Sequence, residues 1–424
     1  MMFVRYAAGD RAWHADGHYA NLTIDDAWLT EPYGHLNYAA LLREMEAHNF
    51  HTTIAFIPWN FDRSEPKVVQ LFRQHADRYS ICIHGNNHDH LEFGGYDRTP
   101  LSGQIADIQQ GLARMERFRT LTSLPVDRVM IFPDEVAPPA PTLRALERYN
   151  FAGAANADVV PIGSVQPTAP LFFLRAVNLN FTSFPLVRRY SAEAGVSKAL
   201  IAVNAFLDNS LLFYGHQSMF TTGINAFDPV AATVNRVQPD TRWSSLGSIA
   251  QHLDRVRLRA DGNYDVVAYG SDLIFQNRLQ RDVIYHVEKQ NEDSLPIRAL
   301  TIDGRPAFYE LSGERLSLAV PVGAGESKHV VIEYQSDLNL ASVDVSKKSP
   351  SVAFLRRISD FRDITMSRST LGRALTRFYY QHHLDDLELD LEGFLPLLLV
   401  LAVVAIAAGW LLRKRARTRN LRIA

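Results

Sequence analysis

Between residues 19 and 150, short apolar runs alternate with stretches whose apolar residues recur at helical spacing. The runs YANLTI, TTIAFI, YSICIH and RVMIF predict buried strands, because they are brief and rich in β-branched and aromatic residues. The stretches LNYAALLREMEAHN, KVVQLFRQHADR, LSGQIADIQQGLARMERFRTL and APTLRALERYN predict the helices between them. Repeated strand–helix units predict an α/β protein with a parallel sheet, either a barrel or a doubly wound sheet.

Residues whose side chains could take part in catalysis or binding follow the ends of several of these strands. In barrel enzymes the site is built at the carboxyl ends of the strands, so the placement favours a barrel with a functional mouth. A later strand-like run, SLLFYGH, ends in the same way. The residues concerned are Asp25, Asp26, Pro58, Trp59, Asn60, His84, Pro133, Asp134, Glu135 and His216.

The pattern changes to period two from about residue 262. Short alternating runs separated by turn signals predict antiparallel strands, with Asp303-Gly304 as a hairpin turn. We therefore expect a (β/α) barrel over residues 1–260 and a small β-sandwich over 261–336. Residues 337–392 have weak periodicity and predict a connector or stalk.

Residues 393–412, GFLPLLLVLAVVAIAAGWLL, are 20 residues without a charge. This length matches a bilayer core of about 30 Å, so the run predicts a transmembrane helix. Acids precede the run and bases follow it, which predicts a cytoplasmic tail at 413–424 and an extracytoplasmic catalytic domain. The first 18 residues contain no apolar signal region, so we expect the natural start to lie further upstream. The alternative is an anchor that inserts after translation, which would leave the catalytic domain facing the cytoplasm.

Composition narrows the functions further. The 424 residues carry 44 Lys+Arg against 46 Asp+Glu, a formal charge of -2, and this lack of a basic field argues against nucleic acid as a partner. With 47% hydrophobic residues the chain can bury a large domain and a smaller one. The single cysteine, Cys82, excludes an internal disulfide.

His84 and His88 stand four residues apart at the end of a predicted strand. Two imidazoles and one carboxylate form a three-ligand set that leaves a coordination position open, which is typical of catalytic zinc. Asp25 and Asp26 are the natural carboxylate donors, since a cation would relieve the repulsion between adjacent acids. The alternatives are ordinary surface histidines and an aspartate pair capping a helix.

Four motifs resemble one known family. LTIDD is similar to its T-F-D-D motif, HGNNH to H-[ST]-x-x-H, IFP to R-x-P-[YF], and LLFYGHQ to the late motif with a single histidine. The family is that of the polysaccharide deacetylases, the chitooligosaccharide deacetylase-like group of carbohydrate esterase family four. The motifs occur in the family's order across residues 19 to about 260. The resemblance implies a distorted (β/α) barrel.

The resemblance also implies a divalent metal, most often zinc, held by Asp26, His84 and His88. Asp25 would be the general base and His216 the general acid. These roles agree with general chemistry, because a metal acidifies water and polarises a carbonyl while a base and an acid move the protons. Cobalt, nickel or manganese would suit the same ligands.

The chain departs from the family pattern at several positions. Ile131 stands where the third motif has an arginine that orients the base, and Arg128 is a possible substitute. Asp134 or Glu135 takes the place of an aromatic residue, and Gly85 that of Ser or Thr. We therefore expect a divergent branch of the family.

Further residues at the strand ends are expected to contact the substrate. Aromatic rings there could stack on sugars, and a backbone N–H near Trp28 or Asn60 could bind an oxyanion. The candidate substrate contacts are Trp28, Trp59, Asn60, His90, Pro133, Glu135 and Tyr214.

The leading hypothesis is a metal-dependent hydrolase that removes acyl groups, with N-acetyl expected, from a cell-envelope or extracellular polysaccharide. It would act on carbon–nitrogen bonds other than peptide bonds. A second hypothesis is a glycoside hydrolase that uses Glu135 as its second carboxylate. A third is a membrane-anchored glycan-binding protein without catalysis, which Ile131 favours.

Overall fold

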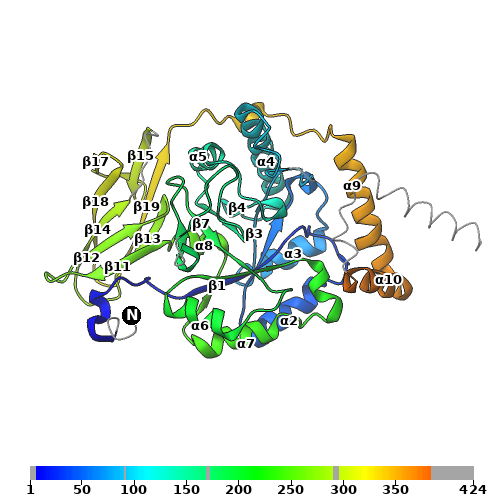
Figure 1. The fold of residues 1–424 in the computed structure, drawn as a ribbon, viewed down its shortest axis with the longest axis horizontal. Coiled ribbons are helices and arrows are strands. Elements are labelled where there is room, and N and C mark those ends of the chain that lie inside the picture. The colour runs from blue at the N-terminus through cyan, green and yellow to red at the C-terminus, as the bar shows by residue number, and fades with distance from the viewer. Residues whose placement is uncertain (1–5, 90–91, 169–171, 290–295, 383–424) are drawn as a thin grey trace, which may run out of the picture. The chain divides into compact units, whose positions relative to one another are not determined.

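The computed structural model describes residues 6–89, 92–168, 172–289 and 296–382 (Figure 1). The chain divides into two compact units, Met1–Arg373 and Ala374–Ala424. The barrel and the sandwich both lie in the first unit. No described helix is long and apolar enough to cross a membrane, and the expected span at 393–412 lies outside the described residues together with the basic tail.

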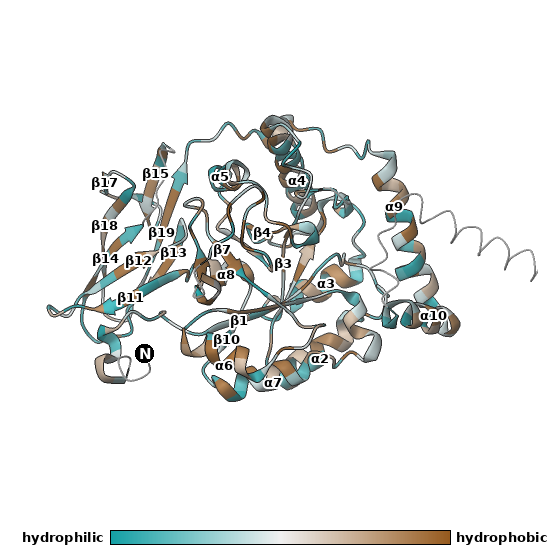
Figure 2. Cartoon of the chain, in the orientation of Figure 1, coloured by the Kyte–Doolittle hydropathy of each residue, from teal (hydrophilic) through white to brown (hydrophobic). Residues whose placement is uncertain are grey.

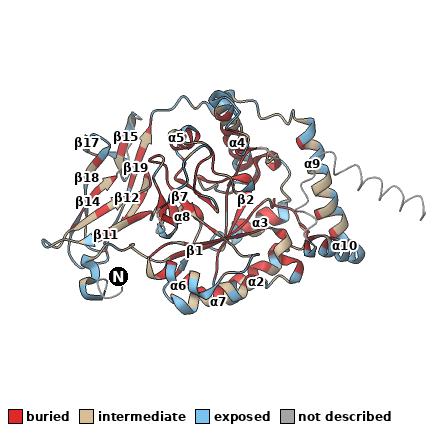
Figure 3. Cartoon of the chain, viewed as in Figure 1, coloured by how far each residue is buried: buried red, intermediate tan, exposed pale blue. Residues whose placement is uncertain are grey.

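The core of the first unit is a curled sheet whose strands are mostly parallel. Each of the strands predicted between residues 19 and 150 forms, and the order across the sheet is β5-β4-β3-β2-β1-β9. The central strands are buried on both faces, as helix-covered parallel sheets require (Figure 3). Their bounds are β1 Tyr19–Ile24, β2 Thr52–Phe56, β3 Tyr79–His84, β4 Val129–Ile131, β5 Gly153–Asn156 and β9 Leu211–Gly215.

One short stretch joins the two ends of this sheet. β7 (Leu186–Arg188) pairs in parallel with β5, and β8 (Tyr190–Ser191) pairs in parallel with β9. Residues 186–191 therefore lie between the first and the last strand of the order, which curls the sheet into a distorted barrel. This agrees with the barrel part of the expected fold class. Two edge pieces, β6 (Val177–Asn178) and β10 (Arg242–Trp243), pair with β7 and β1.

Helices follow the barrel strands as the periodicity predicts. In α4 the apolar residues Ile108, Leu112, Met115 and Phe118 are buried, which is the spacing of one helical face. The helix bounds are α2 Tyr38–His48, α3 Pro66–Gln74, α4 Leu101–Thr122, α5 Ala140–Arg148, α6 Lys198–Phe206, α7 Asp228–Val237 and α8 Leu246–Ala250.

The period-two region forms two sheets with a hydrophobic core of their own. In β18 every second residue from Leu316 to Val322 is buried. Figure 2 shows hydrophobic and hydrophilic positions mixed along the strands of this region. The sheet orders are β11-β12-β14-β18-β17 and β13-β19-β15-β16. The bounds are β11 Asp254–Leu258, β12 Tyr264–Ala268, β13 Asp272–Gln276, β14 Val283–Lys289, β15 Ile297–Ile302, β16 Arg305–Pro306, β17 Glu310–Ser312, β18 Arg315–Val322 and β19 Ser327–Tyr334.

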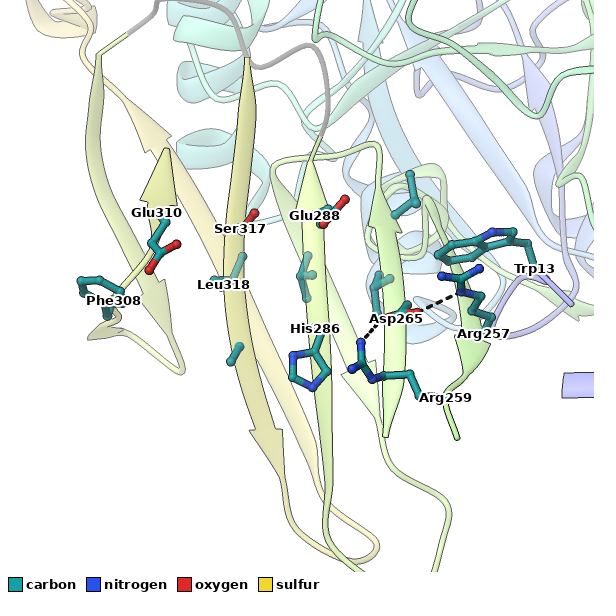
Figure 4. A pocket seen from close by; sticks show the side chains of 14 residues that line it. Trp13, Arg257, Arg259, Asp265, His286, Glu288, Phe308, Glu310, Ser317 and Leu318 are labelled. Carbon is teal, nitrogen blue, oxygen red and sulfur yellow. Dashed lines mark hydrogen bonds and ion pairs between the residues drawn. The ribbon is translucent and has the colours of Figure 1, made fainter. Parts of the chain in front are cut away.

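A buried ion pair fixes the sandwich to the barrel. Nζ of Lys289 in β14 lies 3.3 Å from Oε1 of Glu147 in α5, and the Ser183 hydroxyl donates to the same carboxylate. The outer face of the five-stranded sheet is hollowed into an open groove of about 610 Å³ (Figure 4). Its lining comes from sandwich residues and Trp13, so this groove is separate from the strand ends that carry His84 and His216.

The connector is more ordered than its weak periodicity predicts. It contains α9 (Pro350–Asp360), the π-helical turn η7 (Phe361–Thr365) and the 3-10 turn η8 (Met366–Arg368). We call residues 344–368 the strap, because they lie against the barrel. Val352 and Ala353 of α9 pack on Ile57 and Trp59. A further helix, α10 (Thr370–Gln381), follows the strap.

Candidate active site

The barrel brings together the strand ends that the sequence marks. β1 pairs in parallel with both β2 and β9, and β2 pairs in parallel with β3. Their carboxyl ends therefore lie at the same edge of the sheet. Asp25 and Asp26 follow β1, His84 ends β3, and His216 follows β9.

Three side chains converge at this edge, and we call Asp26, His84 and His88 the metal trio. Oδ1 of Asp26 lies 3.2 Å from Nε2 of His84 and 3.0 Å from Nε2 of His88. That oxygen is buried and makes no hydrogen bond to a described residue. One oxygen and two nitrogens that meet in this way fit the ligand set of a divalent cation.

Hydrogen bonds and charges around the trio determine the tautomer of His84 and shift the pKa values of Asp26 and His88. The carbonyl oxygen of Ile131 lies 3.0 Å from Nδ1 of His84, so Nδ1–H donates there and Nε2 keeps its lone pair. Burial would raise the pKa of Asp26, but His88 and His84 hold it well below its usual range. Burial would lower the pKa of His88, but Asp26 raises it. A proton and a metal therefore compete for the trio.

The loop after β3 has a conformation that explains Gly85. Gly85 has φ +57°, and a Cβ there would lie 2.6 Å from Oε1 of Glu92 and 2.7 Å from Cγ of Pro133. The Glu92 carboxylate accepts hydrogen bonds from the backbone N–H groups of Asn86, Asn87 and His88. Ser or Thr at position 85 would displace this acceptor, so the departure from the family motif is a steric requirement.

An arginine holds Asp25, but it comes from an unexpected place, the residue between β7 and β8. Nη1 and Nη2 of Arg189 donate to Oδ1 and Oδ2 of Asp25 at 2.8 and 2.6 Å. Both residues are 2% exposed. Burial would lower the pKa of Arg189, but Asp25 raises it, so the guanidinium stays charged. This bidentate pair fixes the orientation of the carboxylate.

The suggestion that Arg128 fills this place is therefore wrong. Arg128 precedes β4, at the opposite end of that strand from the site, and its guanidinium lies 5.8 Å from the ring centre of Phe151. Ile131 buries its side chain in the core and contributes its carbonyl oxygen to His84. The arginine that the family takes from the third motif is supplied here by the stretch that closes the barrel.

His216 is paired with an acid. Its backbone N–H donates to Oε1 of Glu193 at 2.8 Å, and its Nδ1 lies 3.4 Å from Oε2. Burial would lower the pKa of His216, but Glu193, Asp26 and Asp25 raise it to about 10. The imidazole is therefore protonated at neutral pH and can donate a proton.

The candidate aromatic contacts are mostly packed. Trp28 is 6% exposed and lies under the guanidinium of Arg63, 4.1 Å from the ring centre. Trp59 is 4% exposed and lies beneath the strap. These are places for packing residues rather than for rings that stack on sugars. Asn60 is 1% exposed, and its backbone N–H already donates to the carbonyl of Ile57.

The other candidate contacts lie on the β4 and β9 sides of the site. Pro133 is buried beside Gly85, whereas Glu135 is half-buried with φ +58°. Burial raises the pKa of Tyr214, and its hydrogen bond to Glu135 raises it further. Tyr214 also lies against Arg189, 4.3 Å from guanidinium carbon to ring centre. His90 lies outside the described residues.

Sequence reasoning missed several supporting residues, chiefly Arg189, Glu193 and Glu92. A signal for Arg189 does exist. In LVRRY, two adjacent arginines stand among apolar residues, and neighbours in an extended chain point to opposite sides, so one of the two should point inward. An arginine on an inner face needs a buried acid as its partner. Glu193 and Glu92 lie in loops, where no periodic pattern identifies them.

No protein-family model matches the chain. No curated protein matches it either. Solved structures similar to it include one from Mycobacterium smegmatis described as a polysaccharide deacetylase. That pair has 15% identity and a TM-score of 0.36, and the match covers 56% of this chain and 91% of the other.

Two further similar structures are peptidoglycan deacetylases. The Bc1960 peptidoglycan N-acetylglucosamine deacetylase has 16% identity and a TM-score of 0.33, covering 56% of this chain and 89% of the other. The peptidoglycan deacetylase PdaC from Bacillus subtilis has 9% identity and a TM-score of 0.30, covering 55% and 90%. All three similar structures are described as deacetylases.

Proposed function

We propose that this chain is a metal-dependent hydrolase that removes acyl groups, N-acetyl foremost, from a polysaccharide. The observation that carries the proposal is the convergence of Asp26, His84 and His88 beside an aspartate held by a buried arginine. Zinc is the proposed ion, since two imidazoles and a carboxylate that leave a coordination position open are typical of catalytic zinc. A cation there supplies Lewis-acid chemistry, which polarises an acyl carbonyl and acidifies water.

Asp25 is the proposed general base. Arg189 holds both of its oxygens, and each carboxylate oxygen retains a further lone pair that can accept the proton of the attacking water. The two hydrogen bonds from Arg189 hold the Asp25 carboxylate in a fixed orientation. Asp26, the next residue, is left free to bind the cation.

His216 is the proposed general acid. An amine is too basic to leave an acyl carbon as an anion, so the departing nitrogen must receive a proton. His216 carries that proton at neutral pH, and Glu193 orients the ring through Nδ1. The base and the acid come from β1 and β9, which are neighbouring strands.

The non-catalytic alternative loses its main argument. It rested on Ile131 in place of an arginine, but Arg189 supplies a guanidinium to Asp25. Glu135, which the glycosidase alternative needs as a second carboxylate, is engaged with Tyr214.

We also propose that residues 393–412 anchor the chain in a membrane with the barrel outside, close to an envelope polysaccharide. The anchor is tested by membrane fractionation of the full chain against one that ends at residue 392. The full chain should be retained in washed membranes, and the shorter chain should be released from them. Retention of both would contradict the anchor.

The enzyme is tested on acetylated chito-oligomers. Chelator treatment should stop acetate release, and added zinc should restore it. Reducing ends formed without acetate would instead indicate a glycosidase. Glycan binding without turnover on a broad panel of acylated glycans would indicate a non-catalytic protein.

A further inference from the structure

Arg356 of α9, far along the chain, makes hydrogen bonds to the loop that carries His88. Nη2 of Arg356 in α9 donates to the carbonyl oxygen of His88 at 2.7 Å and to that of Asn87 at 3.2 Å. His88 has φ +49°, a backbone conformation that is unfavourable for a residue with a side chain. The loop needs outside contacts to hold His88 in this conformation.

Other polar groups of this loop are held by Glu92 of the same loop and by Arg114 of α4. Glu92 accepts the backbone N–H groups, and Nη1 of Arg114 donates to the side-chain oxygens of Asn86 and Asn87 at 2.6 and 2.7 Å. Arg114 also donates from Nη2 to the carbonyl of Ser346 in the strap at 3.1 Å. Arg114 thus reaches the strap from the barrel, while Arg356 reaches the loop from the strap.

The strap itself has attachments that do not involve the loop. Asp360 accepts from Nη2 of Arg63 at 2.6 Å, and the carbonyl of Asp363 accepts from the N–H of Gly34 at 2.6 Å. Val352 packs beside Trp59. The position of Arg356 is therefore set by several contacts, and its Nε is buried without a hydrogen bond to a described residue. Nη2 of the same side chain donates to the carbonyl oxygens of Asn87 and His88.

We propose that Arg356 is a positioning residue for the metal centre. By holding the carbonyls of Asn87 and His88, it keeps the His88 imidazole directed at Asp26 and His84. This inference rests on the proposed function, since it takes His88 as a ligand. Residues that orient metal ligands typically contribute about 10- to 100-fold in metal affinity, and this is the expected effect of losing Arg356.

The test compares Arg356→Gln with two matched variants of the full-length chain. Arg357→Gln removes the exposed arginine next to it on α9. Asp360→Asn weakens a strap attachment without touching the loop. Zinc affinity is measured by competition with a chromophoric chelator, and the absorption of the cobalt-loaded protein reports the ligand geometry. Thermal unfolding of the metal-free proteins shows whether each variant folds.

Arg356→Gln should weaken zinc binding about 10- to 100-fold and alter the cobalt spectrum, with the other two variants unchanged. Equal affinity in wild type and Arg356→Gln would overturn the inference while leaving the proposed function intact. Equal weakening in Asp360→Asn would show that the strap as a whole is responsible, which also overturns a specific role for Arg356. A wild-type chain that binds no zinc would instead contradict the proposed function.

Discussion

Two clusters in this molecule combine carboxylates with histidine, and their surroundings differ. The metal trio lies at the strand ends of the barrel. The second cluster, which we call the helix cluster, consists of Glu44 and His48 on α2 and Asp228 at the start of α7. Nε2 of His48 lies 3.1 Å from Oδ2 of Asp228 and 3.9 Å from Oε2 of Glu44. By residue type alone, both clusters could hold a divalent ion.

The contrast lies in how each aspartate is stabilised. At Asp26, the two imidazoles outweigh burial and keep its pKa low. At Asp228, burial raises the pKa to about 6, because His48 does not offset it and Glu44 adds a like charge. The first aspartate is ready to bind a cation, whereas the second tends to keep a proton in mildly acidic conditions.

The two clusters also differ in their outer contacts. Nδ1 of His84 is fixed by a backbone carbonyl, and a base held by an arginine stands beside the trio. His48 is 38% exposed at its side chain, and its described partners are the two acids of its own cluster. A set of ligand-type residues becomes a candidate catalytic site through the groups that orient it.

Loss of a histidine of the metal trio should have the largest effect on zinc binding and activity. His84→Ala should abolish zinc binding and reduce acetate release to background, because two donors alone hold zinc weakly. The matched His48→Ala should leave both unchanged. Acetate release and bound zinc are measured on the same preparations. Lost activity in His48→Ala with full activity in His84→Ala would reverse the assignment.

Asp25→Asn should have the second-largest effect on activity. Removal of a general base typically lowers the rate by about 10²- to 10⁴-fold, and the neighbouring trio should still bind zinc. The measurement is kcat for deacetylation alongside metal content. Asp62→Asn, a change on an exposed acid, serves as the control and should keep full activity. A fully active Asp25→Asn enzyme would remove Asp25 from the mechanism.

Arg189→Gln should destabilise the fold. It leaves the buried Asp25 carboxylate without its cation, which typically costs about 3–5 kcal/mol in the free energy of unfolding. Arg257→Gln breaks the exposed pair with Asp265 and should cost at most about 1 kcal/mol. Urea unfolding measures both values. Similar small losses in the two variants would show that the Asp25 pair contributes little to stability.

The smallest expected effect is a change in the alkaline limb of the pH profile. His216 is active in its protonated form, and Glu193 raises its pKa, so activity should fall as pH rises through that raised pKa. Glu193→Gln removes a group that raises this pKa, so the limb should move to lower pH. Ser218→Ala removes another partner of Glu193 and should leave the limb in place. An unmoved limb in Glu193→Gln would show that another group titrates there.

The sequence predicted most of the barrel because the repeated strands and helices have regular periods. β1 and β3 begin and end where the apolar runs do, and Asp26, His84 and His88 follow from those strand ends. It did not predict β7 and β8, which have three and two residues and show no measurable alternation. Arg189 was missed for that reason.

The strap was unpredictable for a different physical reason. Its residues contact a loop more than 250 positions earlier, as Arg356 does with His88, and no local pattern records such a pairing. Its apolar positions do not mark one buried face, because Val352 is buried against Ile57 and Trp59 while Phe354 and Leu355 on the same helix are exposed. Long-range contacts between polar groups and backbone carbonyls leave no period in a sequence.

Metal stoichiometry tests the central claim most directly. The full-length chain and the His84→Ala, His88→Ala and His48→Ala variants are equilibrated with zinc, freed of excess ion and examined by elemental analysis. We expect one zinc per chain in the wild type and in His48→Ala, and none in the two trio variants. A wild-type chain without zinc, or an ion that survives both trio changes and disappears with His48, would contradict the account.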